Sequence, residues 1–173
     1  DFAQQLLEAY EQSNMLFVLG RSMNHTTDPV QMMQMACTQL HTILPFAWVA
    51  THFSATDGGV PELAGRLDWA GELPCDEGAL TVALQQRIDR AGWDDWTRLL
   101  DPARDELARL AGSEVVADPI SHGGKSVGVL LAGGKHGPDP DVSSFETQVI
   151  DATADLLGGF HENTARFVRQ REL

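Results

Sequence analysis

Two side chains that could hold a planar ligand lie on one predicted strand. Residues 46–54 are dense in aromatic and β-branched residues, which favours a strand. Because side chains alternate along a strand, Trp48 and His52 face the same side of the sheet, with Ala50 between them. A tryptophan can stack on a flat molecule while its indole N–H donates a hydrogen bond. We therefore expect Trp48 and His52 to line a small-molecule pocket; the alternative is that they are core residues.

The neighbouring predicted strand, residues 63–69, adds three candidates. Leu67 and Trp69 are expected beside Trp48 and His52 on the same face of the sheet. Arg66 could pair with an anionic ligand across the strand, and the alternative is a solvated salt bridge with one of the nearby acids. All three belong to the candidate pocket.

Two more tryptophans lie in the middle of the chain. The protein has four tryptophans against one tyrosine, an unusual ratio. Trp93 and Trp96 could close over a pocket on the sheet, or they could anchor a loop. We include both among the candidate ligand-binding residues.

Metal and thiol chemistry have little support in the sequence. The two cysteines, Cys37 and Cys75, lack the number and spacing of a disulfide framework or a zinc site. The six histidines never occur four residues apart on one predicted helix, so we expect neither a metal nor haem. A redox enzyme would need a thiolate and a resolving thiol, whereas Cys37 falls on a predicted buried helix and Cys75 in a loop.

Helices at the two ends and a glycine hairpin must position these residues. Apolar periodicity predicts helices over residues 2–23, 29–43 and 144–173, the second opened by Asp28 as N-cap and Pro29. At 1.5 Å per residue the last would run about 45 Å, longer than a small domain needs. The variable middle, residues 71–112, predicts helical segments over residues 80–88 and 96–110.

Strands over residues 114–120 and 126–132 are joined by Gly123-Gly124, whose glycines can adopt the positive φ of a tight hairpin. The stretch Val115-Val116-Ala117-Asp118-Pro119-Ile120, followed by Gly123-Gly124-Lys125-Ser126-Val127-Gly128-Val129-Leu130, resembles the GAF family, as does Asp57-Gly58-Gly59 before Leu63. The order of predicted elements extends this resemblance over nearly the whole chain. We count Asp118, within the stretch, among the candidate pocket residues.

The resemblance implies an α+β fold related to the PAS fold. It has a central antiparallel sheet, with the N- and C-terminal helices on one face and the variable middle on the other. We expect one such domain over residues 1–173, with residues 1–23 and 144–173 as terminal signalling helices, in a fragment of a larger protein.

The function implied is a regulatory sensor that binds a small molecule and relays the change to a linked output domain, in a two-component system for example. The domain itself would not be an enzyme. One alternative is a ligand-free relay that forms a homodimer through its terminal helices. A cysteine-based methionine sulfoxide reductase is a further alternative. The cyclic-nucleotide branch of the family carries an Asn-Lys, Phe, Asp-Glu signature, of which Lys135 and Phe145 match but Gly134 replaces the asparagine.

The charge and hydropathy of the chain limit the kinds of partner that it can bind. Twelve Lys and Arg residues against twenty-five Asp and Glu residues give a net charge of −13, which would repel a nucleic-acid backbone. No apolar run approaches the roughly 20 residues that a membrane-spanning helix needs, so we expect no membrane contact. Two cysteines without a disulfide pattern favour a reducing, cytoplasmic location.

Overall fold

A computed structural model describes residues 1–25, 28–56, 59–94 and 96–172, apart from the side chains of residues 12, 23–25, 171 and 172. The elements of the described chain are α1 (Phe2–His25), α2 (Pro29–Ile43), β1 (Phe46–Phe53), β2 (Leu67–Gly71), α3 (Glu77–Ala91), β3 (Leu99–Leu100), α4 (Glu106–Ala111), β4 (Val115–His122), β5 (Lys125–Lys135) and α5 (Ser144–Glu172).

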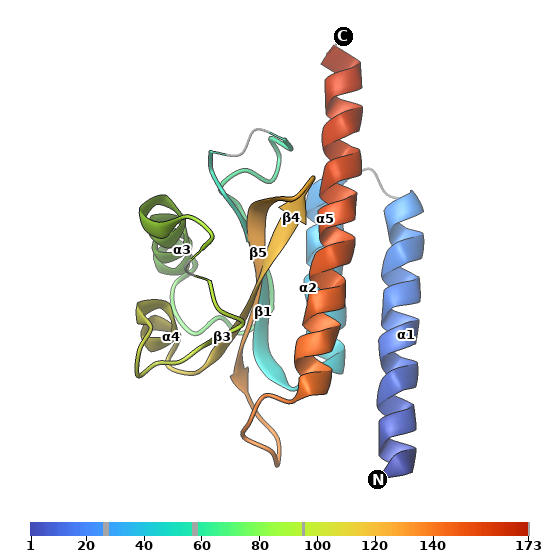
Figure 1. Ribbon diagram of the computed structural model, residues 1–173, viewed down its shortest axis with the longest axis vertical. Helices are drawn as coiled ribbons and strands as arrows, with labels where there is room; N and C mark the ends of the chain where they lie inside the picture. Colours follow the sequence, from blue (N-terminus) through green and yellow to red (C-terminus); the bar gives the residue numbers. More distant parts are fainter. Residues whose placement is uncertain (26–27, 57–58, 95, 173) are drawn as a thin grey trace.

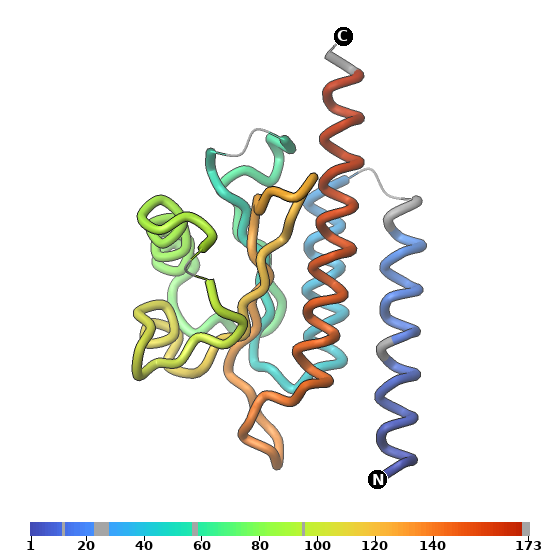
Figure 2. Tube along the Cα trace, in the orientation of Figure 1, coloured from blue at the N-terminus to red at the C-terminus, as the bar shows by residue number. Residues whose placement is uncertain are grey.

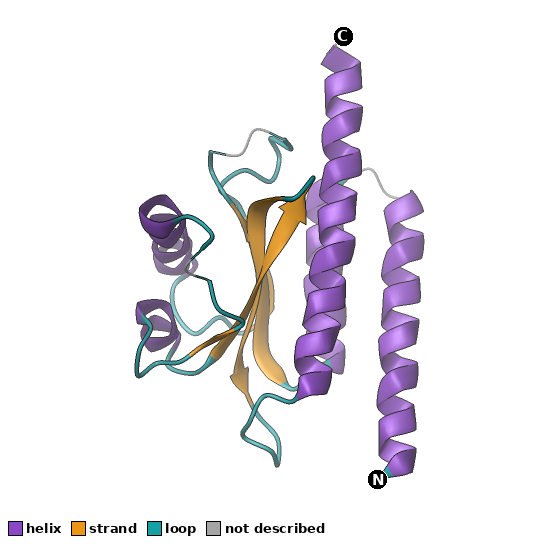
Figure 3. Cartoon of the chain, viewed as in Figure 1, coloured by secondary structure: helices purple, strands orange, loops and turns teal. Residues whose placement is uncertain are grey.

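The five strands form one antiparallel sheet in the order β2-β1-β5-β4-β3. As Figure 1 shows, α2 and α5 cover one face of this sheet and α3 and α4 cover the other. The colouring by secondary structure in Figure 3 makes the three layers plain. The expected antiparallel sheet between terminal helices and a variable middle is confirmed.

Helix α1 forms an outer layer against α2 and α5 rather than against the sheet (Figure 1). Its buried contacts come from its second half, where Met15 and Leu19 are 1% and 0% exposed. The path of the tube in Figure 2 shows that α1 and α5 run in the same direction, and that α5 extends well past the sheet. No helix among the described residues combines the length and the apolar character that crossing a membrane requires.

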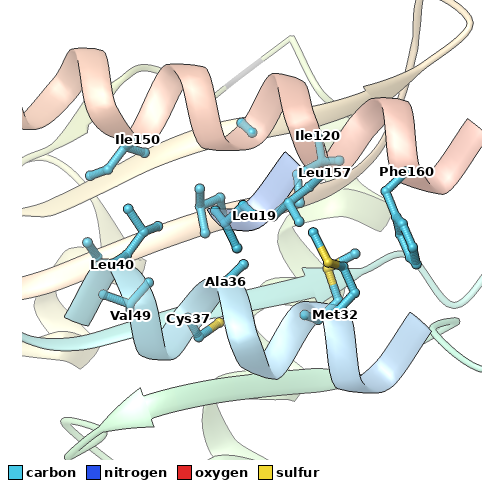
Figure 4. Packing of buried hydrophobic residues seen from close by; sticks show 14 of the residues in the cluster. Leu19, Met32, Ala36, Cys37, Leu40, Val49, Ile120, Ile150, Leu157 and Phe160 are labelled. Atoms are coloured by element: carbon cyan, nitrogen blue, oxygen red, sulfur yellow. The ribbon is translucent and has the colours of Figure 1, made fainter. Parts of the chain in front are cut away.

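The layer between the sheet and the helices is an apolar core. In Figure 4, Met32, Ala36 and Leu40 on α2 point toward α5 and the strands, where they meet side chains such as Leu157 and Val49. Burying a leucine-sized side chain contributes about 1.5–3 kcal/mol, so this layer supplies much of the driving force for folding. As predicted, Asp28 caps α2 by accepting hydrogen bonds from the N–H groups of residues 30 and 31 at 3.0 and 3.3 Å.

Of the other local predictions, the glycine hairpin is confirmed, whereas the bounds of one strand and one helix differ from those expected. The glycine hairpin is present, with φ of 59° at Gly123 and 80° at Gly124. Strand β2 begins at residue 67 rather than 63, and Asp57 and Gly58 of the expected turn lie outside the described residues. The helix predicted over residues 96–110 is correct only near its end: Leu99 and Leu100 pair with β4 as the edge strand β3, and helix α4 begins at Glu106. Asp105 then caps a helix of only 6 residues, because edge pairing and Pro102 stop a helix from forming earlier.

Candidate functional site

The face of the sheet beneath α3 and α4 carries a second buried cluster, separate from the core on the helix side. Trp48 and Ala50 of β1 contribute to it, as predicted from the alternation along that strand. The cluster also contains side chains from α3, α4 and three other strands: Leu80, Leu84, Leu100, Leu107, Ala108, Val115, Ala117, Val129 and Leu131. Leu67, Trp93 and Trp96 pack against its margin. We refer to this cluster and its margin as the α3 side of the sheet.

Trp48 is 2% exposed and lies against Gly133, its register partner on β5. A Cβ atom at residue 133 would come within 2.5 Å of Cζ2 of the indole, so only glycine leaves room for this ring. Among the described residues, the indole Nε1 of Trp48 has no hydrogen-bond partner. An unsatisfied buried donor costs about 1–3 kcal/mol, so a partner for this atom would be favourable.

The hydrogen bonds of Gln85 determine which ring nitrogen of His52 carries a hydrogen. Oε1 of Gln85 accepts from the N–H of Ala55 at 3.0 Å, and Nε2 of Gln85 donates to Oδ1 of Asp89 at 2.8 Å. The atom that faces Nε2 of His52, at 3.3 Å, is therefore the carbonyl oxygen of Gln85, which can only accept. Nε2 of the neutral imidazole must donate, which leaves Nδ1 as an acceptor.

Nδ1 of His52 lacks a hydrogen-bond partner among the described residues, although the side chain is fully buried. Burial lowers the pKa of His52 below its ordinary value, and the hydrogen bond to Gln85 opposes this only in part. The imidazole is therefore neutral and presents a buried lone pair on the α3 side of the sheet.

The two tryptophans of the variable middle form a stacked pair over the α3 side. The rings of Trp93 and Trp96 lie 6.0 Å apart at an interplanar angle of 29°. The guanidinium of Arg87 sits 4.6 Å from the ring centroid of Trp96 and forms an ion pair of 2.6 Å with Asp105, the cap of α4. Nε1 of Trp96, also buried, has no hydrogen-bond partner within the described chain. A cavity of about 390 Å³ borders the Arg87–Asp105 pair.

Arg66 and Trp69 lie outside this cluster, at the edge strand β2, although Trp69 pairs with Ala50 and therefore lies on the predicted face of the sheet. Trp69 is 39% exposed, and both residues line a surface cavity of about 350 Å³. Nε of Arg66 donates to both carboxylate oxygens of buried Asp68, at 3.1 and 3.0 Å. The salt bridge considered as the alternative for Arg66 is thus present, and the guanidinium already neutralises a buried acid.

The structure does not bring Asp118 to the candidate pocket. Its carboxyl faces α5 on the opposite side of the sheet, near Asp151, Asp155 and Arg98. The reason is the alternation of β4: Ala117 belongs to the cluster on the α3 side, so the next residue points to the helices. Burial first, and then the neighbouring carboxyl of Asp151, raise the pKa of Asp118 to about 8.

Sequence reasoning missed the residues that orient the candidate site. Gln85, Arg87 and Asp105 come from α3 and the start of α4 and fix His52 and Trp96. Their spacing in the sequence does not indicate these contacts, which join residues 9 to 33 positions apart in the chain. A buried charged residue such as Arg87 is recognisable only after folding.

Comparisons with known proteins agree on the fold. No protein-family model matches the sequence, and no curated protein matches it either. A GAF sensor protein from Burkholderia vietnamiensis shares 14% identity with a TM-score of 0.60, over 93% of this chain and 94% of that one. The GAF domain of an Acinetobacter phosphoenolpyruvate-protein phosphotransferase shares 15% identity with a TM-score of 0.56, over 88% of this chain and 93% of that one. The chain has the GAF fold.

A third solved structure with this fold is an enzyme. The free methionine-R-sulfoxide reductase of Neisseria meningitidis, solved with its substrate, shares 16% identity with a TM-score of 0.61, over 91% of both chains. In the present GAF fold, Cys37 lies in the core on the helix side, whereas Cys75 packs against the cluster on the α3 side. Burial raises the pKa of the Cys37 thiol to about 12. Two thiols on opposite faces of a sheet, one held protonated, do not form a catalytic pair.

Lys135, which matches one position of the cyclic-nucleotide signature, has a structural role in this GAF fold. Its Nζ lies 2.8 Å from Oε1 of Glu146, and both side chains are more than nine-tenths buried. Glu146 also accepts from the N–H of Ser143 at 2.7 Å, while Ser143 Oγ accepts from the N–H of Glu146 at 3.2 Å, a capping box that opens α5. Lys135 thus ties the end of β5 to the start of the last helix.

Proposed function

We propose that this chain is a regulatory sensor domain that binds a small, uncharged, planar molecule between the sheet and the segment of α3 and α4. The bound state is relayed through α5 to a linked output domain. The observation that carries the proposal is the buried, neutral His52, whose Nδ1 is an acceptor without a partner among the described residues. The indole N–H groups of Trp48 and Trp96 are two buried donors that also lack a hydrogen-bond partner among the described residues.

These three atoms restrict the ligand chemistry. A molecule that satisfies Nδ1 of His52 must donate from N–H or O–H, and one that satisfies the indoles must carry an acceptor. The guanidinium of Arg87 is already paired with Asp105, so its charge is not left to attract an anionic ligand. Heterocycles and amides with adjacent donor and acceptor atoms fit this description, and flat rings suit the surrounding tryptophans.

A linked output domain is supported by the solved structures with this fold. One is a methyl-accepting chemotaxis protein with 13% identity and a TM-score of 0.60, covering 86% of this chain and 98% of that one, and another is part of a phosphotransferase. In the present chain, α5 spans 29 residues and extends beyond the sheet that it covers (Figure 1). A helix of this kind is suited to pass a change in packing to a neighbour.

The test is a metabolite screen read by tryptophan fluorescence and confirmed by calorimetry. The screen contrasts matched pairs such as an aromatic amide and the corresponding carboxylate. A ligand should bind the wild type and lose at least tenfold in affinity to His52→Leu, because about 1.4 kcal/mol corresponds to a factor of ten and a hydrogen bond is worth this much. Trp69→Phe also removes one tryptophan, but at the exposed strand edge, and should bind normally. Binding that survives His52→Leu would overturn the site.

A ligand-free dimerising relay is the second candidate, and a separate observation favours it. Helix α1 exposes large apolar side chains, among them Phe2 at 78% and Phe17 at 62%, and α5 exposes Phe167 at 54%. Such residues on two parallel helices could pair with a second copy of the chain. Sedimentation equilibrium tests this: Phe17→Ser should weaken the dimer, whereas Val82→Ser on α3, whose side chain is 55% exposed, should not.

A further inference from the structure

One short segment of the chain touches both the candidate site and α5. Residues 96–100 begin with Trp96, which packs over the α3 side, and end with Leu100, which is buried in its cluster. Between them, the carbonyl of Arg98 accepts from the N–H of Ala117 at 2.9 Å, so the segment is held at the edge of β4. The side chain of Arg98 reaches the other face of the sheet, where its Nη2 lies 2.8 Å from Oδ2 of Asp151 on α5.

The side chain of Arg98 lies beside a group of acidic side chains whose negative charges repel one another. Asp118 of β4 and Asp151 and Asp155 of α5 face one another, and Arg98 is the cation that opposes their mutual repulsion. Burial, followed by the hydrogen bond and charge of Asp151, raises the pKa of Asp118 to about 8, and the charge of Arg98 acts in the opposite direction. Near neutral pH the raised pKa keeps the carboxyl of Asp118 largely protonated, and the guanidinium of Arg98 lies beside it and Asp151 at the contact between β4 and α5.

The acids lie between two firmly held parts of α5. Before them, Glu146 at the start of the helix is tied to Lys135 of β5. After them, α5 passes so close to β4 that a Cβ atom at Gly158 would be 2.2 Å from the carbonyl oxygen of Ser121. The turns of α5 on either side of Asp151 are therefore anchored. Because of these anchors, a change of charge near Asp151 alters the local packing of α5 and does not detach the helix from the sheet.

We infer that Arg98 couples the candidate ligand site to α5, by leaving Asp151 when a ligand displaces the segment of Trp96. Release of the guanidinium removes the cation from the three carboxyl groups and loosens the middle of α5 against β4. This inference rests on the proposed sensor function for the ligand step, whereas the coupling itself is a property of the chain alone. Among the ion pairs that join described residues, the one between Arg98 and Asp151 links the variable middle to the output helix.

The experiment compares Arg98→Gln with Arg90→Gln. Arg90 is a matched control because it is similarly exposed, 62% against 55%, and pairs with Glu106 inside the variable middle. Two quantities are measured on the whole chain without ligand: the proton-binding midpoint of Asp118, by NMR of its side-chain carboxyl, and the hydrogen exchange of amides around Asp151. Both are repeated in an Asp151→Asn background to complete a double-mutant cycle.

Arg98→Gln should raise the midpoint of Asp118 by roughly half to one pH unit, since a partly exposed cation has been removed. Above that midpoint it should speed exchange around Asp151 roughly two- to fivefold, the range expected for an exposed ion pair. The effect on exchange should disappear in the Asp151→Asn background, whereas part of the shift at Asp118 should remain, because the charge of Arg98 also acts on Asp118 directly. Equal effects from Arg90→Gln, or unchanged exchange and midpoint in Arg98→Gln, would overturn the coupling.

The outcome is independent of the metabolite screen. If a ligand binds at His52 but Arg98→Gln changes nothing, the sensor function stands and the coupling fails. If the coupling is present but no ligand binds, the coupling stands and the sensor function fails. When both are present, ligand binding should reproduce the faster exchange of Arg98→Gln in the wild type and add nothing in the variant.

Discussion

Both faces of the sheet bury apolar side chains, the larger cluster on the helix side and the smaller on the α3 side, but they differ in their buried polar groups. On the helix side, Thr153 donates to the carbonyl of Val149 at 2.8 Å, and Glu146 pairs with Lys135. His161, 1% exposed, shares a contact of 2.8 Å between Nδ1 atoms with His122. On the α3 side, buried nitrogens of Trp48, His52 and Trp96 remain without hydrogen bonds among the described residues.

This difference indicates that the two faces of the sheet have different roles. Long helices cover the helix side and satisfy several of its buried polar groups, which favours stability, although Oγ1 of Thr51 and Oδ2 of Asp118 lack hydrogen-bond partners among the described residues. The α3 side is covered by one helix of 15 residues and one of 6, and it contains buried hydrogen-bond donors and acceptors without partners among the described residues. Unsatisfied buried groups cost stability, and the unpartnered ring nitrogens of Trp48, His52 and Trp96 on the α3 side are what a ligand site would require.

The largest effect is expected where a satisfied ion pair on the helix side is broken. Lys135→Met should lower the free energy of unfolding by about 3–5 kcal/mol, because Glu146 is left buried without its cation. The measurement is urea denaturation near neutral pH. The double variant Lys135→Met with Glu146→Gln should recover most of the loss, since no charge is then buried alone. A double variant as unstable as the single one would show that shape rather than charge matters here.

Matched leucine truncations on the two faces should differ in size. Leu157 and Leu84 are both fully buried, the first on α5 and the second on α3. We expect Leu157→Ala to cost about 3–5 kcal/mol and Leu84→Ala about 2–3 kcal/mol, because the shorter cover on the α3 side can relax into the cavity. Chemical denaturation measures both. A larger cost at Leu84 would contradict the view that the α3 side is the more adaptable face.

Asp118→Asn should change the dependence of stability on pH. The pKa of Asp118, raised to about 8 in the fold, lies above the ordinary 3.8, so the folded chain keeps a proton that the unfolded chain releases. Its contribution is therefore complete below pH 4 and is lost as the pH rises toward 8. The variant should match the wild type near pH 4 and exceed it by about 1–2 kcal/mol at pH 8, a figure reduced for solvent screening. Melting temperatures across this range test it, with exposed Asp94→Asn as the control.

The smallest effect on stability is expected at the candidate site itself. Trp48→Phe leaves a small cavity but also removes a buried indole N–H that has no partner among the described residues, and because the second effect offsets part of the first, it should lower the free energy of unfolding by no more than about 1 kcal/mol. The same change should reduce the fluorescence response to a bound ligand, leaving the part that comes from Trp93 and Trp96. A loss of several kcal/mol, seen by denaturation, would mean that the indole is a structural residue and would argue against the division between the two faces.

Much of the fold could be predicted from local pattern. The cap at Asp28, the glycine hairpin and the periodicity of α2 and α5 depend on residues close together in the chain. Alternation along β1 placed Trp48 on its correct face for the same reason. The error in the helix predicted over residues 96–110 arose because edge pairing of Leu99 and Leu100 with distant Val116 and Val115 overrides a weak helical preference.

The candidate site shows where local pattern ends. The sequence by itself determined which residue types are available and which face of β1 they occupy. Only the tertiary structure decided that Gln85 assigns the hydrogen of His52, that Arg66 is already paired with Asp68, and that Asp118 faces α5. These outcomes depend on partners far away in the chain and on burial, and both exist only once the layers have packed.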